Sequence, residues 1–160
     1  MTDQTPSEPT AGFDINRVQQ DLKSAGRIPL TLAGIGVLTL IWSFLPYYTV
    51  SFSGAGGFGG VGGSGNAWHG FFGWAGAILA LAGGVLAILP ALKVSVSVPP
   101  VTVVALFGAS FVFTLLALVI WPGKVSMPGL SYGHGVGYWL ALLFTLAGTL
   151  VAAYDYRAKS

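Results

Sequence analysis

Four long apolar runs are the feature of this sequence that most restricts its fold. They cover residues 29–48, 70–92, 101–121 and 136–154, and none of them contains Asp, Glu, Lys or Arg. A helix needs about 20 apolar residues to cross the hydrocarbon core of a bilayer, which is about 30 Å thick. A transmembrane barrel would instead need alternating segments of about ten residues. The runs therefore predict an all-α membrane protein with four transmembrane helices.

The composition agrees with a membrane location. Hydrophobic residues make up 54% of the chain and charged residues 8%, and the mean hydropathy is +0.76. This leaves too few polar groups to cover the surface of a soluble globule. The net charge of +2 is too small to indicate a nucleic-acid partner. Because the chain has no cysteine, it can form neither a disulfide nor a thiolate metal site.

The chain also repeats itself at a constant spacing. The pair His69-Gly70 returns as His134-Gly135, and these are the only two histidines in the sequence. Five further identities keep the same spacing: Trp74, Leu81, Ala82, Gly83 and Ala87 match Trp139, Leu146, Ala147, Gly148 and Ala152. A repeat of this kind predicts that one supersecondary unit occurs twice. We therefore expect the four spans to form a duplicated helical hairpin.

Positive charges beside the spans predict the orientation. Lysine and arginine are retained on the cytoplasmic side of a membrane, and an even number of spans places both termini on one side. Of the seven lysine and arginine residues, only Lys124 lies in a loop on the other side of the membrane. The six on the side of the termini are Arg17, Lys23, Arg27, Lys93, Arg157 and Lys159. Both termini of this multi-pass protein are therefore expected in the cytoplasm.

The charge and hydropathy pattern divides the chain into three parts. Residues 1–27 form a disordered cytoplasmic tail, residues 28–154 the four-helix domain, and residues 155–160 a short cytoplasmic tail. Within the first tail, residues 14–25 place Ile15, Val18 and Leu22 on one helical face. This pattern predicts either a short amphipathic helix on the cytoplasmic leaflet or an exposed lead-in without lipid contact.

A glycine-rich loop, residues 49–67, follows the first span and is expected to be mobile and extracytoplasmic. Eight glycines lie between Ser51 and Asn66. Some of them match a dinucleotide-binding fingerprint by letter, but that motif works only between a strand and a helix of a parallel α/β unit. No cofactor is therefore predicted. Four aromatic residues before the loop are expected at the level of the lipid headgroups: Trp42, Phe44, Tyr47 and Tyr48.

Small residues recur along the second and fourth spans at alternating spacings of three and four, which places them on one helix face. Lipid gives little hydrophobic drive for helices to associate, so close van der Waals contact between small residues does this instead. We call these residues the packing seam. Its members are Gly73, Gly76, Ala80, Gly83 and Ala87 in the second span, and Ala141, Thr145, Gly148 and Ala152 in the fourth.

The two histidines admit three interpretations. Each can anchor the start of a helix beside interfacial tryptophans. Together, His69 and His134 can form a pair that takes up protons in mildly acidic surroundings. As a metal or haem site they fall short, because zinc usually takes three or four protein ligands and no cysteine or outer carboxylate accompanies them. We therefore predict neither a metal nor a catalytic residue, and proximity of the two is expected if the hairpins pair.

Two short segments carry a resemblance to a known family. At Leu89-Pro90-Ala91-Leu92-Lys93, followed by Val101-Thr102-Val103-Val104, the sequence resembles the membrane part of mycobacterial proline-rich antigen-type proteins. These are actinobacterial four-span proteins with a domain of unknown function. The resemblance implies an actinobacterial plasma membrane and supplies no activity.

The function that these observations favour is structural. A coupled carrier keeps ionisable residues within its spans, and hydrolytic chemistry needs a nucleophile beside a base and an orienting third group. The spans contain no ionisable group, and all the carboxylates are predicted to be cytoplasmic. We therefore expect a protein that is not an enzyme and that packs through its seams with itself or with a larger membrane complex. A passive conduit or small-molecule binder between the two hairpins is the alternative.

Overall fold

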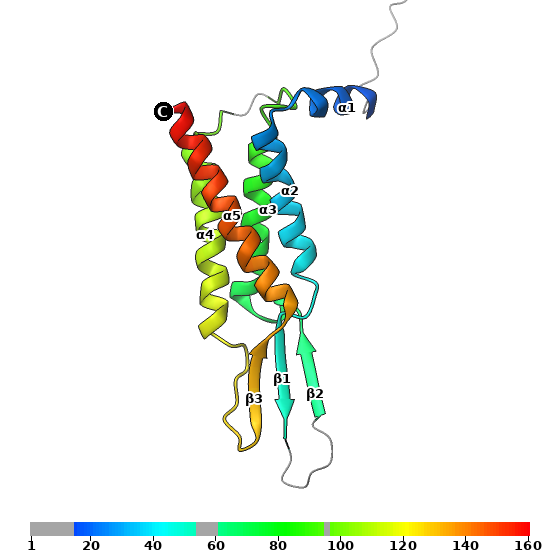
Figure 1. Cartoon of the computed structure of the whole chain (residues 1–160), viewed down its shortest axis with the longest axis vertical. Coiled ribbons are helices and arrows are strands. Elements are labelled where there is room, and N and C mark those ends of the chain that lie inside the picture. The colour runs from blue at the N-terminus through cyan, green and yellow to red at the C-terminus, as the bar shows by residue number, and fades with distance from the viewer. Residues whose placement is uncertain (1–14, 54–60, 95–96) are drawn as a thin grey trace, which may run out of the picture.

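The computed structural model describes residues 15–53, 61–94 and 97–160. In this part of the chain, four helices stand side by side as a bundle and a small antiparallel sheet extends from one end (Figure 1). A further helix, α1, lies crosswise at the other end. The helices are α1 (Ile15–Ser24), α2 (Arg27–Trp42), the 3-10 turn η1 (Ala67–His69), α3 (Phe71–Ile88), α4 (Pro100–Val119) and α5 (Val136–Lys159), and the strands are β1 (Tyr48–Phe52), β2 (Val61–Gly65) and β3 (Leu130–His134).

The four bundle helices form a closed ring. Helix α2 packs on α3 and α5, and α4 packs on the same two neighbours from the other side. The helices α3, α4 and α5 are long and apolar enough to cross a membrane, as judged by length and composition within the described residues. Helix α2 is apolar but shorter, with 16 residues. The fold is thus mostly helical, and three of the described helices are long and apolar enough to cross a membrane.

The predicted end of the first span was wrong. Residues 29–48 were expected as one helix, whereas α2 ends at Trp42. The hydroxyl of Ser43 turns back to the Leu40 carbonyl, 2.6 Å away. Pro46 follows and cannot donate to a continuing helix. The chain therefore turns after Trp42, and its last aromatic residues enter a strand. At the other end of the bundle, α5 continues five residues beyond the predicted limit, to Lys159.

The sheet was not predicted, and the fold is therefore not all-α. Strand β1 lies in the middle, with β2 and β3 antiparallel on either side. Its sequence Tyr-Thr-Val-Ser-Phe alternates β-branched and aromatic residues with small ones, which suits a strand. Both flanks of the glycine-rich loop thus belong to strands, and residues 54–60 at its centre lie outside the described residues.

The sheet joins the two halves of the chain. Strands β1 and β2 belong to the connection between α2 and α3, whereas β3 belongs to the connection between α4 and α5. In the register, Tyr48 lies opposite both Gly65 of β2 and His134 of β3. The two hairpins are therefore held together by the strand pairing outside the bundle as well as by their helices.

Helix α1 occupies the predicted amphipathic segment. It spans Ile15–Ser24 and lies across the end of the bundle at which the C-terminus is found (Figure 1). Ile15 is exposed. Asp14, the first residue of the predicted segment, lies outside the described residues, as do the side chains of Val18 and Leu22. The choice between a leaflet-bound helix and an exposed lead-in stays open.

Candidate functional site

The α3 part of the packing seam lies inside the bundle. A Cβ atom added at Gly76 would lie 3.0 Å from the Thr114 hydroxyl oxygen, and one at Gly83 would lie 3.0 Å from the Phe107 ring. The Ser110 hydroxyl donates to the Gly76 carbonyl at 2.7 Å. These contacts all go to α4. The remaining members also lie inside the protein: Gly73 against Ala67 of η1, Ala80 against α2, and Ala87 beside the buried cluster around Phe107.

The α5 part of the packing seam faces the same interior. A Cβ atom at Gly148 would lie 2.5 Å from the Phe107 ring and 3.1 Å from Ile35. Thr145 is buried, and its hydroxyl returns to the carbonyl of Ala141 in its own helix. Ala141 and Ala152 are buried in the two core clusters. The close contacts made by the seam residues are therefore between helices of this one chain.

Sequence reasoning missed the part that Gly84 plays in a second glycine contact, between α2 and α3. A Cβ atom at Gly36 would lie 2.7 Å from the Ala80 carbonyl oxygen, and one at Gly84 would lie 2.9 Å from the Leu32 carbonyl oxygen. Gly84 is next to Gly83 but faces a different helix, because successive helical residues are about 100° apart. The Gly83-Gly84 pair was the available signal, since adjacent small residues allow two neighbours to approach one helix.

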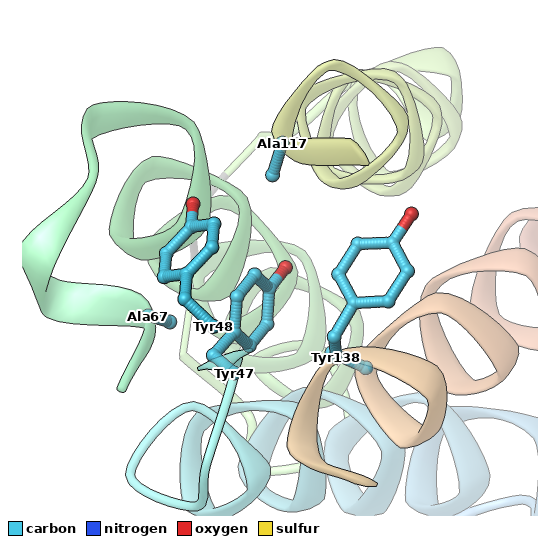
Figure 2. Close-up of a cluster of buried hydrophobic side chains, with 6 residues drawn as sticks. Tyr47, Tyr48, Ala67, Ala117 and Tyr138 are labelled. Atoms are coloured by element: carbon cyan, nitrogen blue, oxygen red, sulfur yellow. The ribbon is translucent and has the colours of Figure 1, made fainter. Parts of the chain in front are cut away.

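Three buried tyrosines form the junction between the bundle and the sheet (Figure 2). The rings of Tyr47 and Tyr48 have centroids 5.2 Å apart, and Tyr138 of α5 lies 5.2 Å from Tyr47. Tyr47 and Tyr48 are 1% and 4% exposed. Their predicted position at the lipid headgroups was therefore wrong. The turn after Trp42 carries both rings into the interior, where Ala67 and Ala117 cover them.

Two hydroxyl groups of this cluster lack a partner. Within the described residues, the hydroxyls of Tyr48 and Tyr138 are buried and accept or donate no hydrogen bond. A buried polar group left unsatisfied costs about 1–3 kcal/mol, so most such groups in folded proteins are paired. Burial, with a smaller contribution from Tyr138, raises the pKa of Tyr48 to about 12. Its hydroxyl is therefore protonated near neutral pH and can act as a donor.

His69 is held by the capping residue of η1. The side-chain oxygen of Asn66 accepts from the backbone N–H of Trp68 at 3.2 Å and lies 2.8 Å from Nδ1 of His69. Since that amide oxygen can only accept, the hydrogen-bond network assigns a proton to Nδ1. In the neutral ring, Nε2 is then an acceptor. His69 itself is exposed, beside Gly65 of β2.

His134 makes different contacts from His69. Its Nε2 atom lies 3.3 Å from the carbonyl oxygen of Ala117, to which it donates in the tautomer that the geometry requires. Its ring lies 4.4 Å from that of Tyr138 and 5.2 Å from that of Trp121, measured between centroids. His134 thus joins the end of β3 to the end of α4. The two histidines of the repeat occupy equivalent places in the chain, but each has its own anchoring partner.

The sheet brings the two histidines to one region without direct contact. Tyr48 separates His134 from Gly65, and a Cβ atom at Gly65 would lie 3.4 Å from the His69 ring. Two strand spacings of about 4.8 Å separate Gly65 from His134. In the described part of the chain, no three His, Cys, Asp or Glu side chains gather as a metal site would require.

A cleft of about 360 Å³ opens on one face of the sheet. Directly paired residues share a face of a sheet, so Gly63, Val50 and Tyr132 form one row across it. Because Gly63 has no side chain, this face of the sheet is hollow over β2. The cleft is lined by Tyr48, Val50, Gly63, Ser64, Gly65, His69, Trp121, Pro122, Gly123 and Tyr132. It therefore lies between a part of the first hairpin and a part of the second.

Cross-linking should test the placement of the two histidines. In a His69→Cys, His134→Cys double variant, a bifunctional thiol linker spanning about 10–15 Å should join the two positions, because His69 lies beside Gly65, which is about two strand spacings from His134. A gel-shift or mass measurement after proteolysis detects the joined fragments. A His69→Cys, Ser160→Cys control should remain unjoined, since α5 with its 24 residues separates these ends by about 36 Å. Equal joining in both variants would contradict the register.

The chain matches no known family model and no curated protein with which it was compared. The likeness to the proline-rich antigen family, carried by residues 89–93 and 101–104, stays a prediction. What the chain does must therefore follow from its own contacts and charges.

Proposed function

We propose that the chain is a four-span protein of the plasma membrane, built as a duplicated helical hairpin with both termini in the cytoplasm. The closed ring of α2, α3, α4 and α5 supports this topology, because α2 packs between two helices that are long enough to span. In both halves two helices flank strand structure, and a glycine, Gly70 or Gly135, directly precedes the second helix, which supports the duplication. Residues 49–67 and the sheet are then extracytoplasmic.

Thiol labelling tests the orientation. The chain has no native cysteine. Ser53→Cys, next to β1, should react with a membrane-impermeant maleimide in intact cells, because the proposed topology places the sheet outside. Ser160→Cys, at the exposed C-terminus, should react only after the cells are permeabilised. The labelled fraction is read from a gel shift, and the reversed pattern would overturn the proposed orientation.

We propose a structural or interaction role, in which the bundle carries the sheet as a contact surface for a membrane-protein partner or a second copy. The observation that carries this proposal is the pairing of β1 with both β2 and β3, which fixes the sheet on the bundle through both hairpins. The seam residues are occupied within the chain, so a partner must contact another surface. The outer edges of β2 and β3 offer unpaired backbone groups of the kind that partner strands use.

Native mass spectrometry of the protein, extracted from its own membranes with mild detergent, tests this role. The proposal predicts either a homo-oligomer or a complex with one membrane protein in fixed stoichiometry. A variant with Gly62→Lys in the edge strand β2 should lose this partner, because a charged edge opposes strand pairing. A monomer without any partner, or a complex unaffected by the lysine, would count against the role.

The alternative role has two forms, a passive conduit and a small-molecule binder between the hairpins. Of these two forms, the contacts favour only the binder. Phe107 fills the space between α3 and α5, because its ring contacts both Gly83 and Gly148. This contact closes the centre of the ring against a passive conduit. The cleft beside Tyr48 instead supports a binding site outside the bundle. An enzyme is not proposed, because Asp155 lies at the opposite end of α5 from the two histidines.

A further inference from the structure

Tyr48, whose hydroxyl is buried and has no partner among the described residues, is part of the wall of the sheet cleft. A Cβ atom at Gly70 would lie 2.8 Å from this hydroxyl and 3.2 Å from Pro122, so the hydroxyl and the proline of the cleft wall are neighbours. Tyr48 is itself one of the lining residues. With 4% of its surface exposed, it can gain a hydrogen bond only from a small group that enters the cleft.

Aromatic rings form one wall of this cleft. The Trp121 and Tyr132 rings meet edge to face, 4.9 Å apart between centroids and 71° between planes. The Tyr132 ring is fixed, because its hydroxyl donates to the Val125 carbonyl at 2.8 Å and accepts from the Val125 N–H at 3.0 Å. The electron-rich faces of such rings attract the weakly positive C–H groups of a ligand.

Polar groups form the other side of the cleft. His69 presents Nε2 as an acceptor, since its Nδ1 is used by Asn66. Strand β2 lies at the edge of the sheet, so backbone groups of residues 63–65 are unpaired on one side. A few fixed donors and acceptors among aromatic walls are the usual composition of a small-molecule site. The charge of Lys124 lies 5.8 Å from the Tyr132 ring, and a single positive charge would neutralise a polyanion poorly.

We propose that this cleft binds a pyranose ring, supplied by a free saccharide or by the headgroup of a glycolipid. A pyranose has C–H groups on its faces for Trp121 and Tyr132, and hydroxyls around its edge for Tyr48, His69 and the β2 backbone. This inference rests on the small-molecule role named above and does not involve a protein partner.

Two neighbouring glycines give a matched test. A Cβ atom at Gly63 meets nothing within 4 Å and points into the cleft, so Gly63→Val fills the cleft without a clash. Gly62→Val adds the same side chain to the opposite face, where its Cβ meets only the Val50 carbonyl oxygen at 3.5 Å. Both changes add a β-branched residue to the same strand. Equal thermal unfolding midpoints of the two variants would show that both are folded.

The measurement is saturation-transfer NMR on the full chain in lipid nanodiscs. The soluble probes are methyl β-glucoside and methyl α-mannoside, and glucosyl diacylglycerol in the nanodisc is the membrane-bound probe. We expect transfer to the ring C–H protons of at least one probe with the wild type and Gly62→Val, and a loss of at least tenfold with Gly63→Val. Tyr48→Phe should weaken binding about fivefold, as expected for one lost hydrogen bond.

The probes also distinguish the two sources of the sugar. Transfer to a soluble glycoside supports a free saccharide, and transfer only to the membrane-bound probe supports a glycolipid headgroup. Absence of transfer to all probes, or equal transfer with Gly63→Val and Gly62→Val, would overturn the proposal. Neither result would bear on the topology or on the protein partner, because thiol labelling and native mass spectrometry use no sugar.

Discussion

Replacing Gly36 with leucine should prevent α2 from packing on α3. The first atom of the new side chain would lie 2.7 Å from the Ala80 carbonyl oxygen, 3.2 Å from Leu81 Cα and 3.3 Å from Gly84 Cα. All three are backbone atoms, so a rotamer change cannot relieve the clash and the two helices must separate. We expect a loss of about 3 kcal/mol or more in the free energy of unfolding, at the upper end of overpacked cores.

Gly34→Leu is the control for this change, two residues away in the same helix. A Cβ atom at Gly34 meets nothing within 4 Å, and this residue is exposed. The variant should therefore keep the wild-type unfolding midpoint in mild detergent, whereas Gly36→Leu should give little folded monodisperse protein. Similar behaviour of the two leucine variants would show that α2 does not pack on α3 through Gly36.

Truncation of Phe107 to alanine should leave a cavity at the centre of the bundle. This side chain is fully buried and contacts residues of three other helices through Ile35, Gly83 and Gly148. A phenylalanine-to-alanine change in a core typically costs about 3–5 kcal/mol. Leu118→Ala, in the same helix but 41% exposed, should cost about 0.5 kcal/mol. Unfolding of both variants in mixed micelles measures the difference.

A double variant tests the Phe107 contact more directly. Gly148→Ala alone should destabilise the protein, because its Cβ would lie 2.5 Å from the Phe107 ring. In the Phe107→Ala background that ring is absent, and the same methyl group fills part of the cavity. The double variant should then be more stable than Phe107→Ala alone, which is a strong departure from additivity. Additive losses would mean that the two positions do not touch.

The spans were predictable from the sequence because hydropathy and length determine them directly. The runs at 70–92, 101–121 and 136–154 each correspond to one observed helix, α3, α4 and α5, although α4 begins one residue earlier and α5 ends five residues later than its run. The predicted first span is too long. Tyr47 and Tyr48 continue its apolar run, although the helix has already ended and Tyr48 begins a strand. The signals that decide the end of α2 are Ser43 and Pro46, and these are local turn chemistry rather than hydropathy.

The sheet and its cleft were harder to predict. Strand β2 has the sequence Val-Gly-Gly-Ser-Gly, and glycine is depleted in strands. Its pairing depends on β1, of which Tyr48 was assigned to the first span and residues 49–52 to the glycine-rich loop. The repeat correctly drew attention to the two histidines, but it could not show that Asn66 holds one and the Ala117 carbonyl the other. Asn66 caps η1, whereas Ala117 belongs to the last turn of α4, so the two halves of the chain supply different partners.

The central place of β1 in the sheet imposes an order on biosynthesis. A chain emerging from the ribosome delivers β1 early, together with its first neighbour β2, but the second neighbour β3 follows only after α4. Until then, one edge of β1 has no partner, and Tyr48 lacks the covering contact of His134. Closing such a distant pairing is slow, because the intervening chain must first be positioned. In the proposed topology, the sheet is thus completed only when the second hairpin has been inserted, so its formation would report that all four bundle helices are in place.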